Sequence, residues 1–147
     1  MDAHVHFLIS VCAQRMYLLK LLQHQGMPPD KLRIVAYSLI VSRIVYALPA
    51  WGGFLSAELT GKVDALLRRL TKFRYLTDKL TVADLMIRAD TDLFKKMQMP
   101  QHCLHHLLPP LRTTDSLRQR GHLFSLPECY TNIQRKSFVM RSLYDFI

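Results

Sequence analysis

The sequence predicts a mainly α-helical fold, a helical bundle followed by an irregular, proline-containing C-terminal tail. Half of the 147 residues are hydrophobic and only five are glycine, a composition typical of a folded globular protein. Through the first hundred residues the apolar side chains recur every three or four positions, which is the period of one helix face. Prolines and Gly121 interrupt this pattern later, so we expect two parts, residues 1–99 and residues 100–147.

The first helix is expected from Asp2 to about Gln25. Asp2 is suited to cap its start, and Gly26 is suited to the left-handed conformation that ends many helices. The two prolines that follow prevent the helix from continuing. Its apolar stripe consists of Val5, Leu8, Cys12, Met16, Leu19 and Leu22.

A second helix is expected from Pro29 or Asp30 to about residue 48. On a straight α-helix its apolar residues lie along two sides, so we expect burial on both sides. The overlapping segment 34–55 contains one charge, Arg43, and is long enough to cross a bilayer. Because Arg43 lies near its middle and Pro49 and two glycines follow, we expect a buried helix and no membrane partner.

A third helix is expected to begin after Ser56, a good N-cap residue. Its core stripe is formed by Leu59, Val63, Leu66, Leu70 and Phe73. Arg68 is placed to pair with Asp64 four residues earlier. Three further cations, which we expect on one face opposite the stripe and without a local partner, are Lys62, Arg69 and Lys72.

The chain after residue 80 predicts shorter elements. Thr81 and Asp84 resemble a capping box for a short helix through about Arg88, and Asp90 or Thr91 is expected to start another toward residue 99. Residues 125–127 read as extended chain before a last helix at about 137–146.

The charge balance favours a polyanionic partner. Twenty Lys and Arg against eleven Asp and Glu give a formal net charge of +9 and a sequence pI near 9.8. Three widely spaced cysteines do not form the framework of a secreted disulfide protein, and no secretory signal follows Met1. We therefore expect an intracellular protein, in the nucleus or cytoplasm, and not a secreted one.

No motif of catalysis or cofactor binding is visible. A Gly-x-Ser-x-Gly elbow and a phosphate-binding glycine loop are both missing from the sequence. The spacing of six metal-ligand residues does not fit a zinc site, which usually needs two close pairs. These six possible metal ligands are His102, Cys103, His105, His106, His122 and Cys129. We accordingly assign no catalytic residue, no metal and no cofactor.

Two groups of residues together resemble a known family. The first runs from Ser38 to Gly53 and contains Tyr46, Pro49 and Trp51 in a Tyr-x-x-Pro-x-Trp pattern. The second comprises Leu-His-His-Leu-Leu-Pro-Pro at 104–110, Leu-Arg-Gln-Arg-Gly-His at 117–122, Leu-Pro-Glu-Cys at 126–129 and Ser-Phe-Val-x-Arg at 137–141. In order and spacing they resemble the region after the palm of LINE-type, non-LTR retrotransposon reverse transcriptases, and the resemblance covers nearly the whole chain.

The resemblance implies a thumb that grips a template–primer duplex of RNA or DNA, followed by the tail of the family. The RNA-directed DNA polymerase activity of that family needs palm aspartates that hold two metal ions, including an adjacent pair. This sequence contains no Asp-Asp pair, and Asp90-Thr91-Asp92 is read as a helix start, where acids are ordinarily caps. We therefore expect a truncated, non-catalytic fragment rather than an enzyme.

The residues expected to contact nucleic acid are Lys62, Arg69, Lys72, Arg74, Arg118 and Arg120. Arg and Lys neutralise phosphates without strict geometry, which suits binding that is indifferent to sequence. The same residues also fit a merely solvated helix face. The alternative function is a helical protein-interaction or dimerisation module left from a degenerate or domesticated element, whose exposed apolar surface met the missing palm domain or a second copy.

The missing aspartate pair predicts that the purified chain extends no primer on any template with Mg²⁺ or Mn²⁺. A gel-based extension assay with a complete polymerase as positive control checks this. Metal-dependent extension by a clean preparation would contradict the interpretation as a palm-less fragment.

Overall fold

The computed structural model describes residues 2–112 and 121–146 and is mainly α-helical, as predicted. Within these two ranges there is no β-strand, only an isolated antiparallel bridge between Leu111 and Phe124. The helices form two compact units, the first from Met1–Leu48 with Leu55–Met86 and the second from Pro49–Phe54 with Ile87–Ile147. This boundary does not coincide with the division expected at residue 100.

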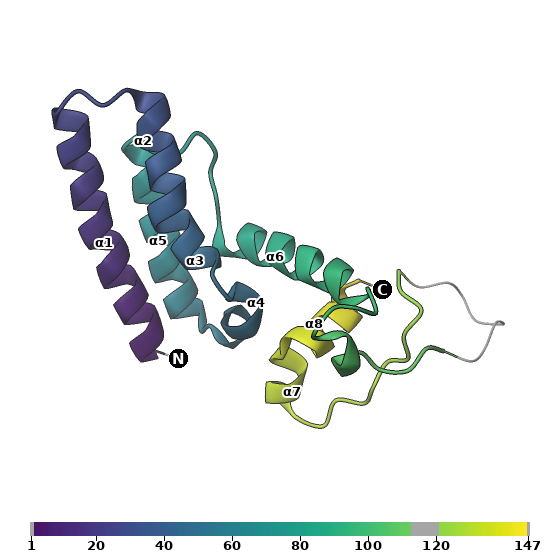
Figure 1. The fold of residues 1–147 in the computed structure, drawn as a ribbon. Coiled ribbons are helices and arrows are strands. Elements are labelled where there is room, and N and C mark those ends of the chain that lie inside the picture. The colour runs from purple at the N-terminus through teal and green to yellow at the C-terminus, as the bar shows by residue number, and fades with distance from the viewer. Residues whose placement is uncertain (1, 113–120, 147) are drawn as a thin grey trace. The chain divides into compact units, whose positions relative to one another are not determined.

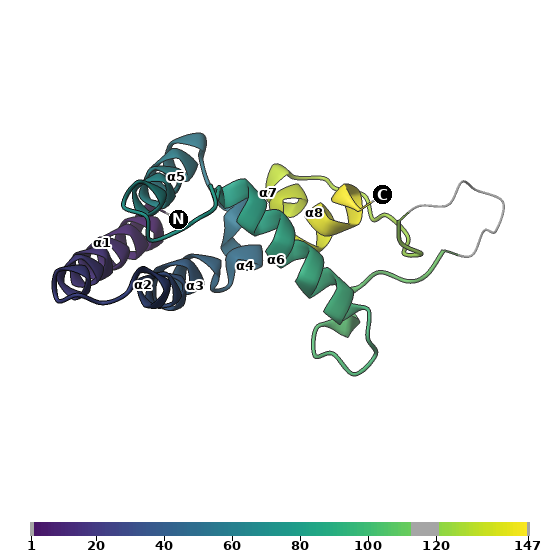
Figure 2. The same ribbon diagram turned by 90° about the horizontal axis from the view of Figure 1, so that it is seen from above.

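Three helical rods lie side by side in the first unit (Figures 1 and 2). They are α1 (Asp2–His24), the rod formed by α2 (Pro29–Ala36), η1 (Tyr37–Val41) and α3 (Ser42–Val45), and α5 (Ala57–Lys72). Burial of one large apolar side chain stabilises a fold by about 1.5–3 kcal/mol. The rods bury a common core that includes Val5, Leu8, Cys12, Leu19, Leu32, Ile40, Ile44, Val63, Leu67 and Leu70.

Helix α1 ends as the sequence predicts. Gly26 adopts a left-handed conformation with φ of 84°. Its N–H donates to the carbonyl of Gln23 at 3.1 Å, and the N–H of Met27 donates to that of Leu22 at 3.1 Å. These two bonds form a Schellman motif, which satisfies carbonyls that the helix end leaves free.

The rod after the turn contains one π-helical turn, η1. A π turn holds more residues than an α turn and disturbs the regular ladder of backbone hydrogen bonds. Arg15 of α1 donates to the carbonyl oxygen of Leu39 in this turn. The π turn is therefore tied to the neighbouring helix by a charged donor.

The expectation that this rod is buried on both sides is wrong. Ile34 is 60% exposed, whereas Ile40 and Val41 are adjacent in sequence and both buried. The π turn rotates the later residues relative to a straight α-helix, so that both fall on one side. Two faces that look separate in the sequence thus become one buried face, formed by Leu32, Ala36, Ile40, Val41, Ile44 and Leu48.

Helix α5 begins at the predicted cap. The side-chain oxygen of Ser56 accepts a hydrogen bond from the N–H of Leu59 at 3.2 Å. Four of the five stripe residues are buried as expected, but Phe73, just after the helix, is 50% exposed.

The segment from Val82 to Met97 is one helix, α6, and not the two short ones expected. Its capping box is confirmed, since Thr81 Oγ1 accepts from the N–H of Asp84 at 3.1 Å and the N–H of Thr81 donates to Asp84 Oδ2 at 3.3 Å. Asp90 caps nothing, because it lies in the middle of this helix and is 5% exposed.

Asp90 instead pairs with Arg141 inside the second unit. Arg141 Nε donates to Asp90 Oδ2 at 2.9 Å and Nη2 donates to Oδ1 at 3.0 Å, with both side chains nearly buried. The same guanidinium donates to the carbonyls of Lys136 at 2.7 Å and Pro49 at 3.2 Å. Burial raises the pKa of Asp90, and its hydrogen bonds and ion pair with Arg141 offset part of that rise.

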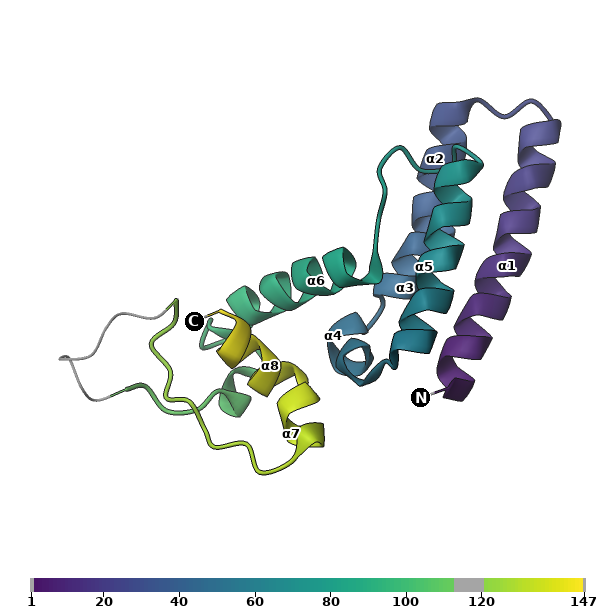
Figure 3. The ribbon, with the colours of Figure 1, turned by 180° about the vertical axis from the view of Figure 1, so that it is seen from behind.

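The other elements of the second unit are short (Figure 3). They are α4 (Leu48–Trp51), η2 (Gly52–Phe54), η3 (His105–Leu107), α7 (Asn132–Lys136) and α8 (Phe138–Asp145). Helix α8 agrees with the last helix that the sequence predicts. A core of Phe94, Phe124 and Leu143 holds the unit together, and the rings of Phe94 and Phe146 stack with centroids 5.4 Å apart.

Two segments of the first 54 residues are long and apolar enough to cross a membrane, Asp2–His24 and Pro29–Phe54. In the structure, 22% of the most apolar stretch of the first segment and 33% of that of the second are buried. Core helices of water-soluble proteins pass the same test of length and composition. The expectation of no membrane partner thus stays a prediction.

Val41 is 1% exposed, which predicts that Val41→Asp unfolds the first unit. A buried, unpaired carboxylate costs about 3–5 kcal/mol against a total stability of about 5–15 kcal/mol. Ile34→Asp is the matched control because the same charge is added to an exposed position on the same rod. Thermal melting followed by far-UV circular dichroism should show a large loss for Val41→Asp alone; equal melting temperatures would contradict the burial.

Replacing Arg141 by Leu should destabilise the second unit by about 3–5 kcal/mol, since Asp90 would remain buried without its partner. The double change Asp90→Leu with Arg141→Leu should recover part of the loss because no buried charge is left. Trp51, the single tryptophan, lies in this unit, so its fluorescence during urea unfolding is the measurement. An unchanged midpoint for Arg141→Leu would show that the ion pair contributes nothing.

Candidate nucleic-acid interface

Basic side chains gather at the C-terminal end of α5 and in the turn after it. Residues 62–79 contain six Lys or Arg but only two Asp. Five of the six cations, all but Lys62, are exposed. This segment is therefore the part of the first unit best suited to contact a polyanion.

A left-handed residue, Arg74, ends α5 and redirects the chain. Its φ is 62°, its N–H donates to the carbonyl of Thr71 at 3.0 Å, and the N–H of Tyr75 donates to that of Leu70 at 2.9 Å. This is again a Schellman motif, built here on a residue with a side chain. The turn leaves the Arg74 side chain exposed and sends Tyr75 back into the core.

Tyr75 joins this turn to α1. Its hydroxyl donates to Gln23 Oε1 at 2.9 Å, and the side chain is 3% exposed. Burial raises the pKa of this hydroxyl, so it stays a neutral donor at physiological pH.

One side of the turn forms what we call the cationic cleft, lined by Arg68, Lys72, Lys79, Asp64, Thr71 and Leu80, with Thr81 at its margin. Its volume is about 470 Å³. Three cations thus face one carboxylate, and Asp64 Oδ1 accepts the N–H of Val82 at 2.8 Å. Positive charge in excess around one hollow is the arrangement that attracts phosphate groups.

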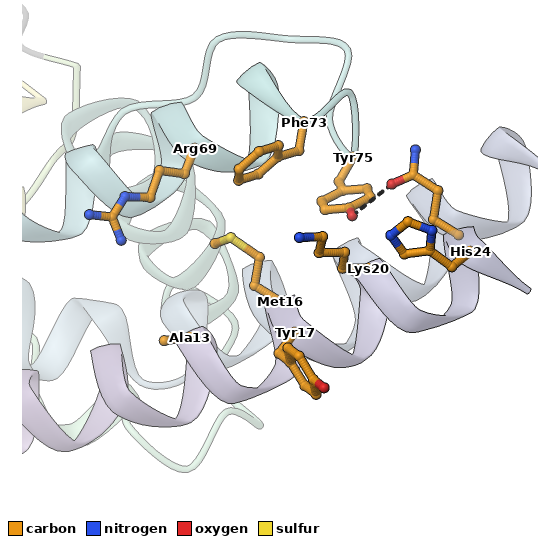
Figure 4. A pocket seen from close by; sticks show the side chains of 9 residues that line it. Ala13, Met16, Tyr17, Lys20, His24, Arg69, Phe73 and Tyr75 are labelled. Atoms are coloured by element: carbon orange, nitrogen blue, oxygen red, sulfur yellow. Dashed lines mark hydrogen bonds between the residues drawn. The ribbon is translucent and has the colours of Figure 1, made fainter.

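A second hollow, the aromatic cleft, lies between α1 and the end of α5 (Figure 4). Its volume is about 290 Å³. Phe73 and Tyr75 lie on one wall with ring centroids 6.1 Å apart, and Met16 and Lys20 face them from α1. Arg69 and Tyr17 lie at the margin, where the ring of Tyr17 is turned away from Phe73.

The expected strip of Lys62, Arg69 and Lys72 does not line one hollow. Arg69 lines the aromatic cleft and Lys72 the cationic cleft. Lys62 has a local partner, since its Nζ lies 2.7 Å from Glu58 Oε1. The hydrogen bond from Lys62 and its charge lower the pKa of Glu58.

The remaining residues predicted to contact nucleic acid lie outside the two clefts or outside the described residues. Arg74 is exposed in the turn after α5 and is not among the residues that line either cleft, whereas Arg118 and Arg120 lie outside the described residues. Arg68 and Asp64 both line the cationic cleft, but the predicted ion pair between them is not among the ion pairs of the described residues, and Asp64 accepts the Val82 N–H. Lys79 and Lys20 were not predicted, because a turn and a neighbouring helix bring them to the clefts and neither is marked by α5 periodicity.

Three of the four histidines of the second unit form hydrogen bonds with backbone groups. His122 Nδ1 accepts the N–H of Phe124 at 3.2 Å, so the proton lies on Nε2, which donates to the carbonyl of Leu143 at 2.7 Å. His105 Nδ1 contacts the carbonyl of Met97 at 2.9 Å, and His102 Nδ1 accepts the N–H of Leu104 at 3.2 Å. Among the residues that the structure describes, no three His, Cys, Asp or Glu side chains are grouped to hold a metal ion.

Comparisons with known proteins found no match, whether to a family model, to a curated protein or to a solved structure.

Proposed function

We propose that this chain is the thumb-side, C-terminal portion of a LINE-type reverse transcriptase, which binds template–primer nucleic acid through the cationic cleft and carries no polymerase chemistry of its own. The observation that carries the binding proposal is the grouping of Arg68, Lys72 and Lys79 around one hollow with a single carboxylate. Contacts to phosphates need positive charge and little stereochemical precision, and this grouping supplies it.

Within the described residues, the first group contacts the 137–141 segment of the second. Pro49 of the first group accepts a hydrogen bond from Arg141 of the second at 3.2 Å. A β-carbon at Gly53 would lie 2.0 Å from Arg141 Nη1 and 2.3 Å from the Lys136 carbonyl, so the close approach needs a glycine. Contact between segments about 90 residues apart gives both patterns a common structural reason, which supports reading them as one family signature.

Phosphate binding of this kind has a defined signature. Each phosphate that a cation neutralises releases counterions, so affinity falls as salt rises. Sequence preference is weak because phosphates are the same along every strand. Both properties suit a thumb, which must hold whatever duplex the palm has made.

A specific observation favours the second candidate, a protein-interaction or dimerisation module. Helix α1 is apolar on its outer side as well, where Phe7 is 58%, Leu18 50% and Leu21 41% exposed. These side chains recur at the spacings of a helix seam, as Phe7, Val11, Gln14, Leu18 and Leu21. Exposed large apolar side chains at these spacings, interrupted here by Gln14, ordinarily mark a contact surface.

The cationic cleft predicts the salt dependence of binding. Changing Arg68, Lys72 and Lys79 together to Gln should lower the slope of log affinity against log salt by about two to three, since each phosphate contact contributes about 0.9 on double-stranded DNA. Fluorescence anisotropy with an RNA–DNA duplex at several salt concentrations measures the slope. Unrelated duplex sequences should lose affinity equally.

The matched control changes Lys31, Lys95 and Lys96 to Gln, because these three exposed lysines carry the same total charge elsewhere in the chain. Circular dichroism should show both variants folded, as exposed substitutions rarely affect stability by more than about 0.5 kcal/mol. Equal slopes for the two variants would refute the cationic cleft as the site. Absent duplex binding, together with concentration-dependent self-association in sedimentation, would favour the interaction module.

A further inference from the structure

The aromatic cleft has features that phosphate neutralisation does not require. Phe73 comes directly after α5, where the helical period makes it a core residue, yet its ring is 50% exposed on the wall of the cleft. Tyr75 beside it is held by its hydroxyl bond to Gln23, so this part of the wall is rigid. A planar apolar surface is therefore presented to solvent on a fixed support.

The charges around this surface have one sign. Lys20 extends from α1 toward the two rings, and Arg69 lies at the margin one turn of α5 before Phe73, with its guanidinium directed away from the rings (Figure 4). The lining includes no carboxylate. A ligand that is planar, aromatic and negatively charged matches both properties, and a nucleotide is such a ligand.

The volume limits how much of a ligand enters. About 290 Å³ is at the lower end of small-molecule pockets, which suits a single base and not a stacked pair of bases. A base inside an intact duplex is covered on both faces by its neighbours and is not free to stack on Phe73. The ligand must therefore present an unpaired base.

We propose that the aromatic cleft binds one unpaired nucleotide adjoining a duplex, with its base stacked on Phe73 and its phosphate near Lys20, while Arg69 at the margin contacts the adjoining strand. The proposal rests on the proposed function for the presence of nucleic acid, but it assigns a different group of that ligand to a different site. Arg69 lies three residues before Lys72 on α5, about one helical turn away. A strand that crosses the end of α5 therefore reaches both clefts.

The experiment compares a blunt duplex with the same duplex carrying a one-nucleotide overhang, by fluorescence anisotropy with the full chain. The overhang should raise affinity about tenfold, in line with the contribution of one base stacked on an aromatic side chain. Phe73→Ala should abolish this difference and leave blunt-duplex affinity unchanged. Phe73→Trp should retain it, because another flat ring takes the same place.

Tyr37→Ala is the matched control, since it removes a ring of similar exposure, 49%, that lines neither cleft. It should leave the overhang preference intact. Equal affinity of the wild-type chain for blunt and overhang duplexes would overturn the proposal, as would a preference that survives Phe73→Ala.

A single-stranded hexanucleotide separates failure of this proposal from failure of the proposed function. Duplex binding that depends on the cationic cleft but ignores the overhang would leave the proposed function standing and refute the nucleotide site. If neither duplex binds, the proposed function fails, and hexanucleotide binding that Phe73→Ala abolishes would replace the duplex-end site by a site for single strands alone. Absence of all three kinds of binding would refute both.

Discussion

The second unit depends on a single guanidinium group. Arg141 donates to the carboxylate of Asp90 and to the carbonyls of Lys136 and Pro49, which belong to three separate segments of the chain. A guanidinium has five donors in a rigid plane, whereas an ammonium is a compact charge, so lysine does not replace it. Because both charged side chains are nearly out of water, their desolvation must be offset by this full set of bonds.

The same constraint extends to the backbone around Trp51. The loop after this residue passes so close to Arg141 that only a glycine fits at position 53, although its backbone is not left-handed. The reason for glycine here is therefore space and not conformational freedom. Sequence patterns near Trp51 and near Arg141 are thus two sides of one packing arrangement.

The local features of the fold could be predicted from the sequence, and the distant ones could not. Helix ends at Gly26 and Ser56 depend on hydrogen bonds within a few residues, so the residue types at these positions are enough to predict them. In contrast, the π turn accepts a hydrogen bond at the Leu39 carbonyl from Arg15, which lies 24 residues earlier in the sequence. Asp90 finds Arg141 at a separation of 51 residues, so a pattern that reads acids as helix caps misplaced it.

In the candidate site too, local features could be predicted from the sequence and distant ones could not. Basic residues of α5 could be recognised as candidates from the sequence, but that Arg69 and Lys72 line different hollows could not. Lys79 lines the cationic cleft from the turn after α5, and helical periodicity does not predict where a residue of a turn lies.

That turn determines the position of both clefts. A residue with a β-carbon in the left-handed conformation costs about 1–2 kcal/mol, a cost that glycine avoids, and Arg74 is in this conformation. The hydroxyl bond of Tyr75 to Gln23 anchors the chain just after it and helps to offset that cost. With Tyr75 anchored, Phe73 is left on the wall of one hollow, while the chain that follows brings Lys79 to the other. Backbone strain persists only where surrounding contacts hold the strained residue in place, and such residues are concentrated at binding sites. Arg74, between exposed cations and the ring of Phe73, is a strained residue of this kind.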